Sequence, residues 1–208
     1  MSLLPQLDQS EKEKKEVPPS EVQAGALVNI GLFLLELIKI AILAGLTIWL
    51  VRYFLFKPFY VKGESMQPNF FESEYLIIDE LTYRFRPPVR GEVIVMKAPV
   101  AEKDFYLKRI VGLPGERVKI EDNKVIIYNE QYPQGKVIEE SYLTEETDGS
   151  YSTTLGPNEY FVMGDNRNAS FDSRRFGPIE KDKIVGKAWL RGWPPTRISI
   201  FSAPKYNF

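Results

Sequence analysis

The sequence predicts a mostly β fold, in which a coiled, partly closed antiparallel sheet follows one N-terminal transmembrane helix. One long apolar segment lies near the N-terminus, at about residues 27–56. Beyond it, apolar residues recur in short runs and in alternation, as they do in half-buried strands. The 208 residues also include 13 Phe, 11 Tyr, 15 Pro and 14 Gly. This composition favours many short strands and turns over a helical bundle.

The first 26 residues are predicted to be a disordered tail, because lysines and glutamates are mixed before a pair of prolines. The apolar segment has its core at about 31–51, and a membrane helix needs about 20 residues. Glu36 and Lys39 lie three residues apart within it, where they can pair. We predict one membrane span. A buried helix of a soluble protein is the alternative, a cleaved signal peptide fits less well, and the flanking charges do not set the orientation.

Residues 57–208 are predicted to form one β-rich domain of ordinary size. The polar, acidic stretch at about 131–158 is interpreted as an insertion over the sheet. A hairpin is expected at 117–128, with its turn at Asp122 and Asn123. Further strands are predicted at 75–78, 92–96, 106–111, 160–163 and 184–190.

The absence of cysteine and histidine excludes several kinds of site. No thiol nucleophile, Cys-based zinc site or Ser-His-Asp triad can be built. A hydrolase with this composition must take its general base from Lys, Asp, Glu or Tyr. The net charge of −1 favours no nucleic-acid partner.

Ser65, in the stretch 63–68, is a candidate nucleophile if the chain supplies a base. Lys108 is the candidate base, because on a strand it shares a face with Tyr106 and Ile110. Burial can lower the pKa of a lysine by about 3–5 units, and a neutral lysine can take a proton from serine. Arg109 cannot do so, because its guanidinium stays charged. A strand lysine is more often a solvated surface group.

The stretch 164–177 holds two Asp, two Asn, two Ser and three Arg within 14 residues. This density predicts a fixed polar loop, in which Asp172 pairs with Arg174 or Arg175. A turn capped by Asp165 and Asn166 is the simpler interpretation.

These stretches together resemble the bacterial type I signal peptidases, or leader peptidases. These membrane-bound serine proteases use a Ser-Lys dyad to remove signal peptides from exported preproteins. The motifs at 65–68, 106–115 and 164–177 occur in the family's order, and 91–95 resembles a further family strand. The resemblance covers roughly residues 59–190, which is the whole predicted domain apart from its ends.

The resemblance implies a role for each matching residue. Ser65 would attack the scissile carbonyl to form an acyl-enzyme, with its own N–H as one oxyanion donor. Lys108 would be the general base, and Ser170 would hydrogen-bond the lysine and orient it. Asp172 and Arg174 match an ion pair that supports the site.

The resemblance also implies substrates with small residues, of the Ala-x-Ala type, before the cut. Ordinary core packing is the alternative role for the residues that match the family's subsites. Two positions depart from the family: Gly63 stands where the best-known members have a serine that is the second oxyanion donor, and Asn69 stands where Thr is usual. The subsite positions are Phe59, Val61, Met66, Tyr106 and Leu107.

The family further implies a single-pass protein of the bacterial plasma (inner) membrane, with residues 57–208 on the extracytoplasmic side. We expect a monomer that meets preprotein signal peptides and membrane lipid, with no cofactor, no metal and no nucleic acid. Three alternatives are a self-cleaving repressor of the LexA type, a membrane-anchored binding domain and an inactive relative. The first requires a helix-turn-helix where this chain has its apolar segment.

Overall fold

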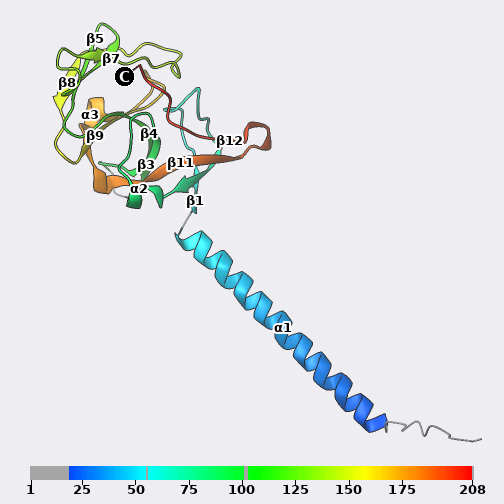
Figure 1. Ribbon diagram of the computed structural model, residues 1–208. Helices are drawn as coiled ribbons and strands as arrows, with labels where there is room; N and C mark the ends of the chain where they lie inside the picture. Colours follow the sequence, from blue (N-terminus) through cyan, green and yellow to red (C-terminus); the bar gives the residue numbers. More distant parts are fainter. Residues whose placement is uncertain (1–18, 55, 101–102, 208) are drawn as a thin grey trace, which may run out of the picture. The chain divides into compact units, whose positions relative to one another are not determined.

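Helix α1, Pro19–Phe54, leads into the β-rich part of the chain (Figure 1). The computed structural model describes residues 19–54, 56–100 and 103–207, and it divides into two units at residues 1–49 and 50–208. Residues 19–26 of the predicted disordered tail are helical, and the rest of that tail, residues 1–18, lies outside the described residues. Proline suits the first position of a helix, where its missing N–H costs nothing.

The apolar part of α1 runs over residues 29–50, with a mean hydropathy of 2.1. None of this window is buried against the rest of the described chain. Its 22 residues are long and apolar enough to cross a membrane.

The larger sheet of the second unit is antiparallel, with the order β1-β2-β11-β3-β4-β9-β10 and with β12 paired to β11. This path has two ends, so the sheet is not closed into a barrel. The expected mostly β fold behind one apolar helix is confirmed. The strands of this sheet are β1 (Phe56–Tyr60), β2 (Tyr75–Asp79), β3 (Val93–Lys97), β4 (Phe105–Gly112), β9 (Glu159–Met163), β10 (Ile179–Glu180), β11 (Ile184–Trp193) and β12 (Ser199–Ile200).

Strand β11 comes late in the sequence but lies between two early strands. Its Ala188 pairs with Ile78 of β2, and its Lys187 pairs with Ile94 of β3. Within the described sheet, β11 therefore connects the β1–β2 pair to the β3–β4 pair.

A second, smaller sheet has the order β7-β6-β5-β8. Its central hairpin turns at Asp122 and Asn123, with φ of 48° and 61°, as a two-residue turn with left-handed residues requires. The stretch 131–158 does not simply cover the main sheet, because it contributes β7 and β8 to this second sheet. The strands are β5 (Arg117–Glu121), β6 (Lys124–Tyr128), β7 (Lys136–Val137) and β8 (Tyr151–Thr154).

Strand β4 is buried on both faces. Ile110 belongs to one apolar cluster, with Ile94 and Val162, and Val111 belongs to another, with Val118. A polar side chain placed in the middle of β4 is therefore removed from water whichever face it occupies. The described residues also include four short helical turns: α2 (Thr82–Phe85), α3 (Ser173–Phe176), η1 (Lys181–Lys183) and η2 (Pro195–Arg197).

Candidate active site

Three segments bring the predicted functional residues together. Ser65 lies in the loop between β1 and β2, whose base is tied by Val61 N–H donating to Glu74 O at 2.9 Å and Ser73 N–H donating to Val61 O at 3.0 Å. Lys108 lies on β4. The polar loop 164–177 follows β9.

Ser65 and Lys108 are in direct contact. The Lys108 Nζ donates a hydrogen bond to Ser65 Oγ at 2.7 Å, although the two residues are 43 positions apart. Only 4% of Lys108 is exposed, and the Tyr106 ring lies 5.6 Å from its Nζ. Burial lowers the pKa of Lys108 to about 8, against the opposing effect of Asp172 and Asp165. A neutral amine is thus accessible close to neutral pH.

Ser170 lies beside the pair but does not bond the lysine. Its Oγ is buried and has no hydrogen-bond partner of good geometry among residues 19–54, 56–100 and 103–207. A Cβ on Gly164 would overlap both Ser170 and the Ser65 carbonyl oxygen. Glycine at 164 therefore allows the two serine-bearing loops to touch.

Asp172 and Arg174 form the predicted ion pair. Arg174 Nε donates to Asp172 Oδ1, and a terminal guanidinium nitrogen donates to Oδ2, both at 2.9 Å. The other partner of Oδ2 is Gly164 N–H, at 3.0 Å. Burial raises the pKa of Asp172, but Arg174, Gly164 N–H and the Ser170 hydroxyl outweigh it, so the pKa lies below its usual value. The carboxylate stays charged and fixes the polar loop.

A second buried ion pair was not predicted. Arg109 Nε and a terminal nitrogen donate to the two oxygens of Asp165, at 2.8 and 2.6 Å. The next residue, Asn166, donates its backbone N–H to Ser65 O at 3.0 Å. The abundance of Arg and Asp in the polar loop indicated such pairs, but no sequence signal assigned Asp165 to a residue 56 positions away.

A cleft of about 460 Å³ opens at the Ser65–Lys108 pair. Val61, Met66 and Leu107 line the cleft and also belong to one buried core cluster. The two interpretations are therefore compatible, because the same side chains pack in the core and form the wall of the cleft. No cluster of three acidic side chains in the described part of the chain could hold a metal ion. All five predicted subsite positions line the cleft: Phe59, Val61, Met66, Tyr106 and Leu107.

An antiparallel β domain that holds a buried lysine against a serine hydroxyl is arranged as in Ser-Lys hydrolases. Comparison with known proteins specifies the family. The family described as signal peptidase, peptidase S26, matches residues 34–193. The chain therefore belongs to the signal peptidase family S26, as the sequence motifs indicated, and is a serine peptidase of the type I class.

Several relatives cover most of the chain. It is 33% identical over 196 residues to a probable signal peptidase I-2 of Synechocystis, covering 91% of this chain and 82% of the relative. It is 34% identical over 188 residues to signal peptidase IB of Staphylococcus aureus MRSA252, covering 84% and 94%. The crystal structure of a signal peptidase I from Enterococcus faecalis V583 is 28% identical, with a TM-score of 0.43, covering 49% of this chain and 97% of that one.

Proposed function

We propose that this protein is a membrane-anchored signal peptidase that uses Ser65 as nucleophile and Lys108 as general base. The observation that supports this assignment is the 2.7 Å contact between Ser65 Oγ and the Nζ of Lys108, a lysine that is only 4% exposed. The substrates are preproteins, cut after small residues of the Ala-x-Ala type.

The reaction proceeds through an acyl-enzyme. Neutral Lys108 takes the hydroxyl proton of Ser65 as Oγ bonds to the scissile carbonyl carbon. Lys108 then gives this proton to the leaving amine as the C–N bond breaks. Water attacks the resulting ester, and Lys108 accepts the proton of that water before Ser65 recovers it.

Negative charge that develops on the carbonyl oxygen requires hydrogen-bond donors. The Ser65 backbone N–H is one donor, and loss of one such donor costs about 10²–10³ in rate. Gly63 brings no side chain to this position, and its φ of 77° lies in the left-handed region. The second donor therefore comes from a group other than the residue 63 side chain.

Asp172 and Arg174 support the base directly, whereas Ser170, which does not bond the lysine, acts on it through Asp172. Asp172 raises the pKa of Lys108, whereas burial and Arg174 lower it. The polar loop thus limits the effect of burial and keeps the lysine able to carry a proton between the serine and the leaving amine.

The substrate lies in the cleft as an extended strand. Residues 105–109 of β4 pair with β3, but β9 pairs only with 109–112. Across the cleft, β1 is the terminal strand of the sheet path. An extended peptide fits between such edges, with alternate side chains directed into the subsites.

Helix α1 is the single membrane anchor, and residues 57–208 lie on the extracytoplasmic side of the bacterial plasma membrane. The apolar window 29–50 and the family support this placement. The monomer meets preprotein signal peptides and membrane lipid.

The test is cleavage of a preprotein by the detergent-solubilised enzyme. Ser65→Ala, Lys108→Ala and Lys108→Arg should each lose at least about 10³-fold in kcat, since removal of either member of a catalytic pair abolishes its joint function. Lys119→Ala, at a half-buried lysine paired with Glu121 on β5, should leave cleavage unchanged. Cleavage by Ser65→Ala would place the site elsewhere, and a folded but inert wild type would favour a binding domain or an inactive relative.

A further inference from the structure

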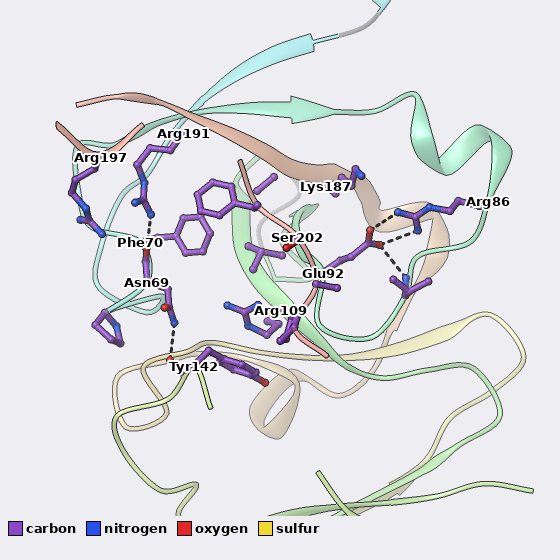
Figure 2. Close-up of a pocket in the computed structure, with 17 residues that line it drawn as sticks. Asn69, Phe70, Arg86, Glu92, Arg109, Tyr142, Lys187, Arg191, Arg197 and Ser202 are labelled. Atoms are coloured by element: carbon purple, nitrogen blue, oxygen red, sulfur yellow. Dashed lines mark hydrogen bonds and ion pairs between the residues drawn. The ribbon is translucent and has the colours of Figure 1, made fainter. Parts of the chain in front are cut away.

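Asn69 makes two side-chain hydrogen bonds to distant parts of the chain. Its Nδ2 donates to the backbone oxygen of Tyr142 at 2.9 Å and to Asp165 Oδ2 at 2.8 Å. The partners are 73 and 96 positions away, so both bonds are tertiary. In Figure 2, Asn69 points toward Tyr142, and the Arg109 guanidinium lies beside the same tyrosine.

Asn69 lies in the same loop as Ser65, four residues further along. Arg191 donates to the Asn69 carbonyl oxygen, and Phe70 N–H donates to Met66 O at 2.9 Å. The loop between Ser65 and Asn69 is therefore held through its backbone. A displacement of Asn69 would be transmitted to Ser65.

The Asp165 bond connects this loop to the strand of the base. Asp165 already accepts two bonds from Arg109, the immediate neighbour of Lys108 on β4. Asn166 holds the Ser65 carbonyl from the same polar loop. The serine loop is thus fastened to the polar loop at the nucleophile itself and four residues beyond it.

The Tyr142 bond connects the loop to a fixed segment on the side of the second sheet. The Tyr142 ring lies 4.0 Å from the Arg109 guanidinium carbon, and its hydroxyl donates to Glu140 at 2.5 Å. Glu140 in turn accepts two bonds from the buried Arg167, at 2.8 and 2.5 Å. Arg167 is held to the Gly164 carbonyl oxygen at 3.2 Å.

We propose that Asn69 is a positioning residue, which uses both amide hydrogens to hold the Ser65 loop against Asp165 and Tyr142 and so sets the contact between Ser65 and Lys108. A threonine at this position has one O–H donor and could satisfy only one of the two acceptors. This inference rests on the proposed function, because it concerns the geometry of the Ser65–Lys108 pair.

Asn69 lines a different cavity from the substrate cleft. Together with Arg109 and Tyr142 it borders a cavity of about 670 Å³, whose lining includes neither Ser65 nor Lys108 (Figure 2). Substitution of Asn69 should therefore lower kcat and leave KM within about threefold, as for a group that acts on the reacting pair rather than on substrate binding.

The test compares Asn69→Thr with Asn69→Val in the full chain, with a preprotein as substrate. The two side chains have the same shape and differ in one hydrogen-bond donor. Since one net hydrogen bond corresponds to about a fivefold to tenfold effect, kcat should fall about fivefold to tenfold in the Thr variant and about 30-fold to 100-fold in the Val variant. The kcat of Asn69→Asp should fall furthest, because the new carboxylate has no hydrogen-bond donor and faces the carboxylate of Asp165.

Folded enzyme is quantified by circular dichroism at the assay temperature, so that kcat refers to native protein. The smaller pair Asn69→Ser and Asn69→Ala makes the same comparison if the Val variant does not fold. Asn168→Thr and Asn168→Val are the matched controls, because this exposed asparagine donates to Glu145 at 2.7 Å, and kcat should be the same in both.

Equal kcat values for the Thr and Val variants would assign Asn69 a packing role and overturn the inference. A Thr variant with wild-type kcat would do the same, because the second bond would then have no effect. Either result, obtained while Ser65→Ala is inert, leaves the proposed function intact. Cleavage by Ser65→Ala would instead refute the proposed function itself.

Discussion

Lys108 and Arg109 are neighbours on β4, and both side chains are buried. Burial lowers the pKa of Lys108 to about 8, and in the described part of the chain its amine bonds the Ser65 hydroxyl rather than a carboxylate. Burial acts on Arg109 in the same direction, but its two bonds to Asp165 outweigh burial and raise its pKa. One residue can therefore lose its proton while the next stays charged and fixes the polar loop.

On the proposed function, the pH dependence of the reaction follows from Lys108. Its pKa of about 8 means that the amine is mostly protonated at pH 6 and mostly neutral at pH 10. We expect kcat/KM to rise about tenfold per pH unit below pH 8 and to level off above it, as for a required free base. A pH series with one preprotein checks this, and a flat profile from pH 6 to 10 would exclude Lys108 as the base.

The same shift predicts a stability cost. The pKa of Lys108 is about 8 in the folded protein, against 10.5 for an ordinary lysine, so the folded state binds this proton more weakly than the unfolded state. Below about pH 8 the amine is protonated in both the folded and the unfolded state, and the full cost of burying the charge then destabilises the fold. The cost disappears as pH rises toward 10.5. Lys108→Met should therefore raise the free energy of unfolding at pH 7 by up to about 3 kcal/mol while abolishing cleavage. Urea unfolding at pH 7 and pH 10.5 measures this, and an equal change at both would contradict it.

Gly164 permits the approach of the two serine loops. In Gly164→Ala the new methyl group would overlap Ser170 and the Ser65 carbonyl oxygen, so the loops must separate. We expect at least a 100-fold loss of kcat, because displacement of about 1 Å at a reacting group can cost that much. Gly192→Ala meets no atom nearer than 3.9 Å and should keep full activity. Equal activities would show that the loop contact is dispensable.

At the scale of elements, alternating apolar residues identified the longer strands of the main sheet and the hairpin to within a few residues. The additional strands could not be found in this way. β7, β10 and β12 are two residues long and are defined by their partners. β1 contains Pro58, which in a sheet is confined to edges, and a sequence alone does not identify an edge.

The candidate site was predictable where its residues lie in motifs. Ser65 and Lys108 were singled out by residue type and position, and they lie in contact. Asn69 was noted only as a departure from the family, and neither its role nor the Arg109–Asp165 pair was predicted, because both depend on which segments β4 and the polar loop meet. Pairings over 56 and 96 positions leave no periodic signal.

On the proposed function, the cleft between β1 and β4 should limit the size of the substrate side chains that it admits. Leu107→Ala should enlarge a subsite and improve kcat/KM for a preprotein with Val in place of Ala before the cut by about tenfold, relative to the Ala substrate. Ile120→Ala is the control, since it removes a buried side chain from the second sheet at similar cost and should not change this ratio. If the ratio of kcat/KM for the Val substrate to that for the Ala substrate is unchanged in Leu107→Ala, Leu107 does not form a subsite.

At the scale of the molecule, α1 presents apolar side chains that nothing in the described chain covers. We expect the protein to resist alkaline extraction from membranes. The double variant Ile38→Arg and Ile42→Arg, near the middle of the window 29–50, should be extracted, because each arginine near the centre of a bilayer costs about 2.5–3.5 kcal/mol. The control variant Val137→Arg, at an exposed position of β7, should stay in the membrane fraction. Retention of the double variant would argue against α1 as the anchor.

On the proposed function, strand β11 should also determine when proteolysis can begin during biosynthesis. Ser65 and Lys108 belong to strand pairs that only β11 joins within the described sheet, and β11 is translated after both. A nascent chain that stops before Ile184 has its nucleophile and its base but lacks the strand that aligns them. On the proposed function, a nascent chain without β11 should therefore lack an aligned Ser65–Lys108 pair and should not yet cut neighbouring chains.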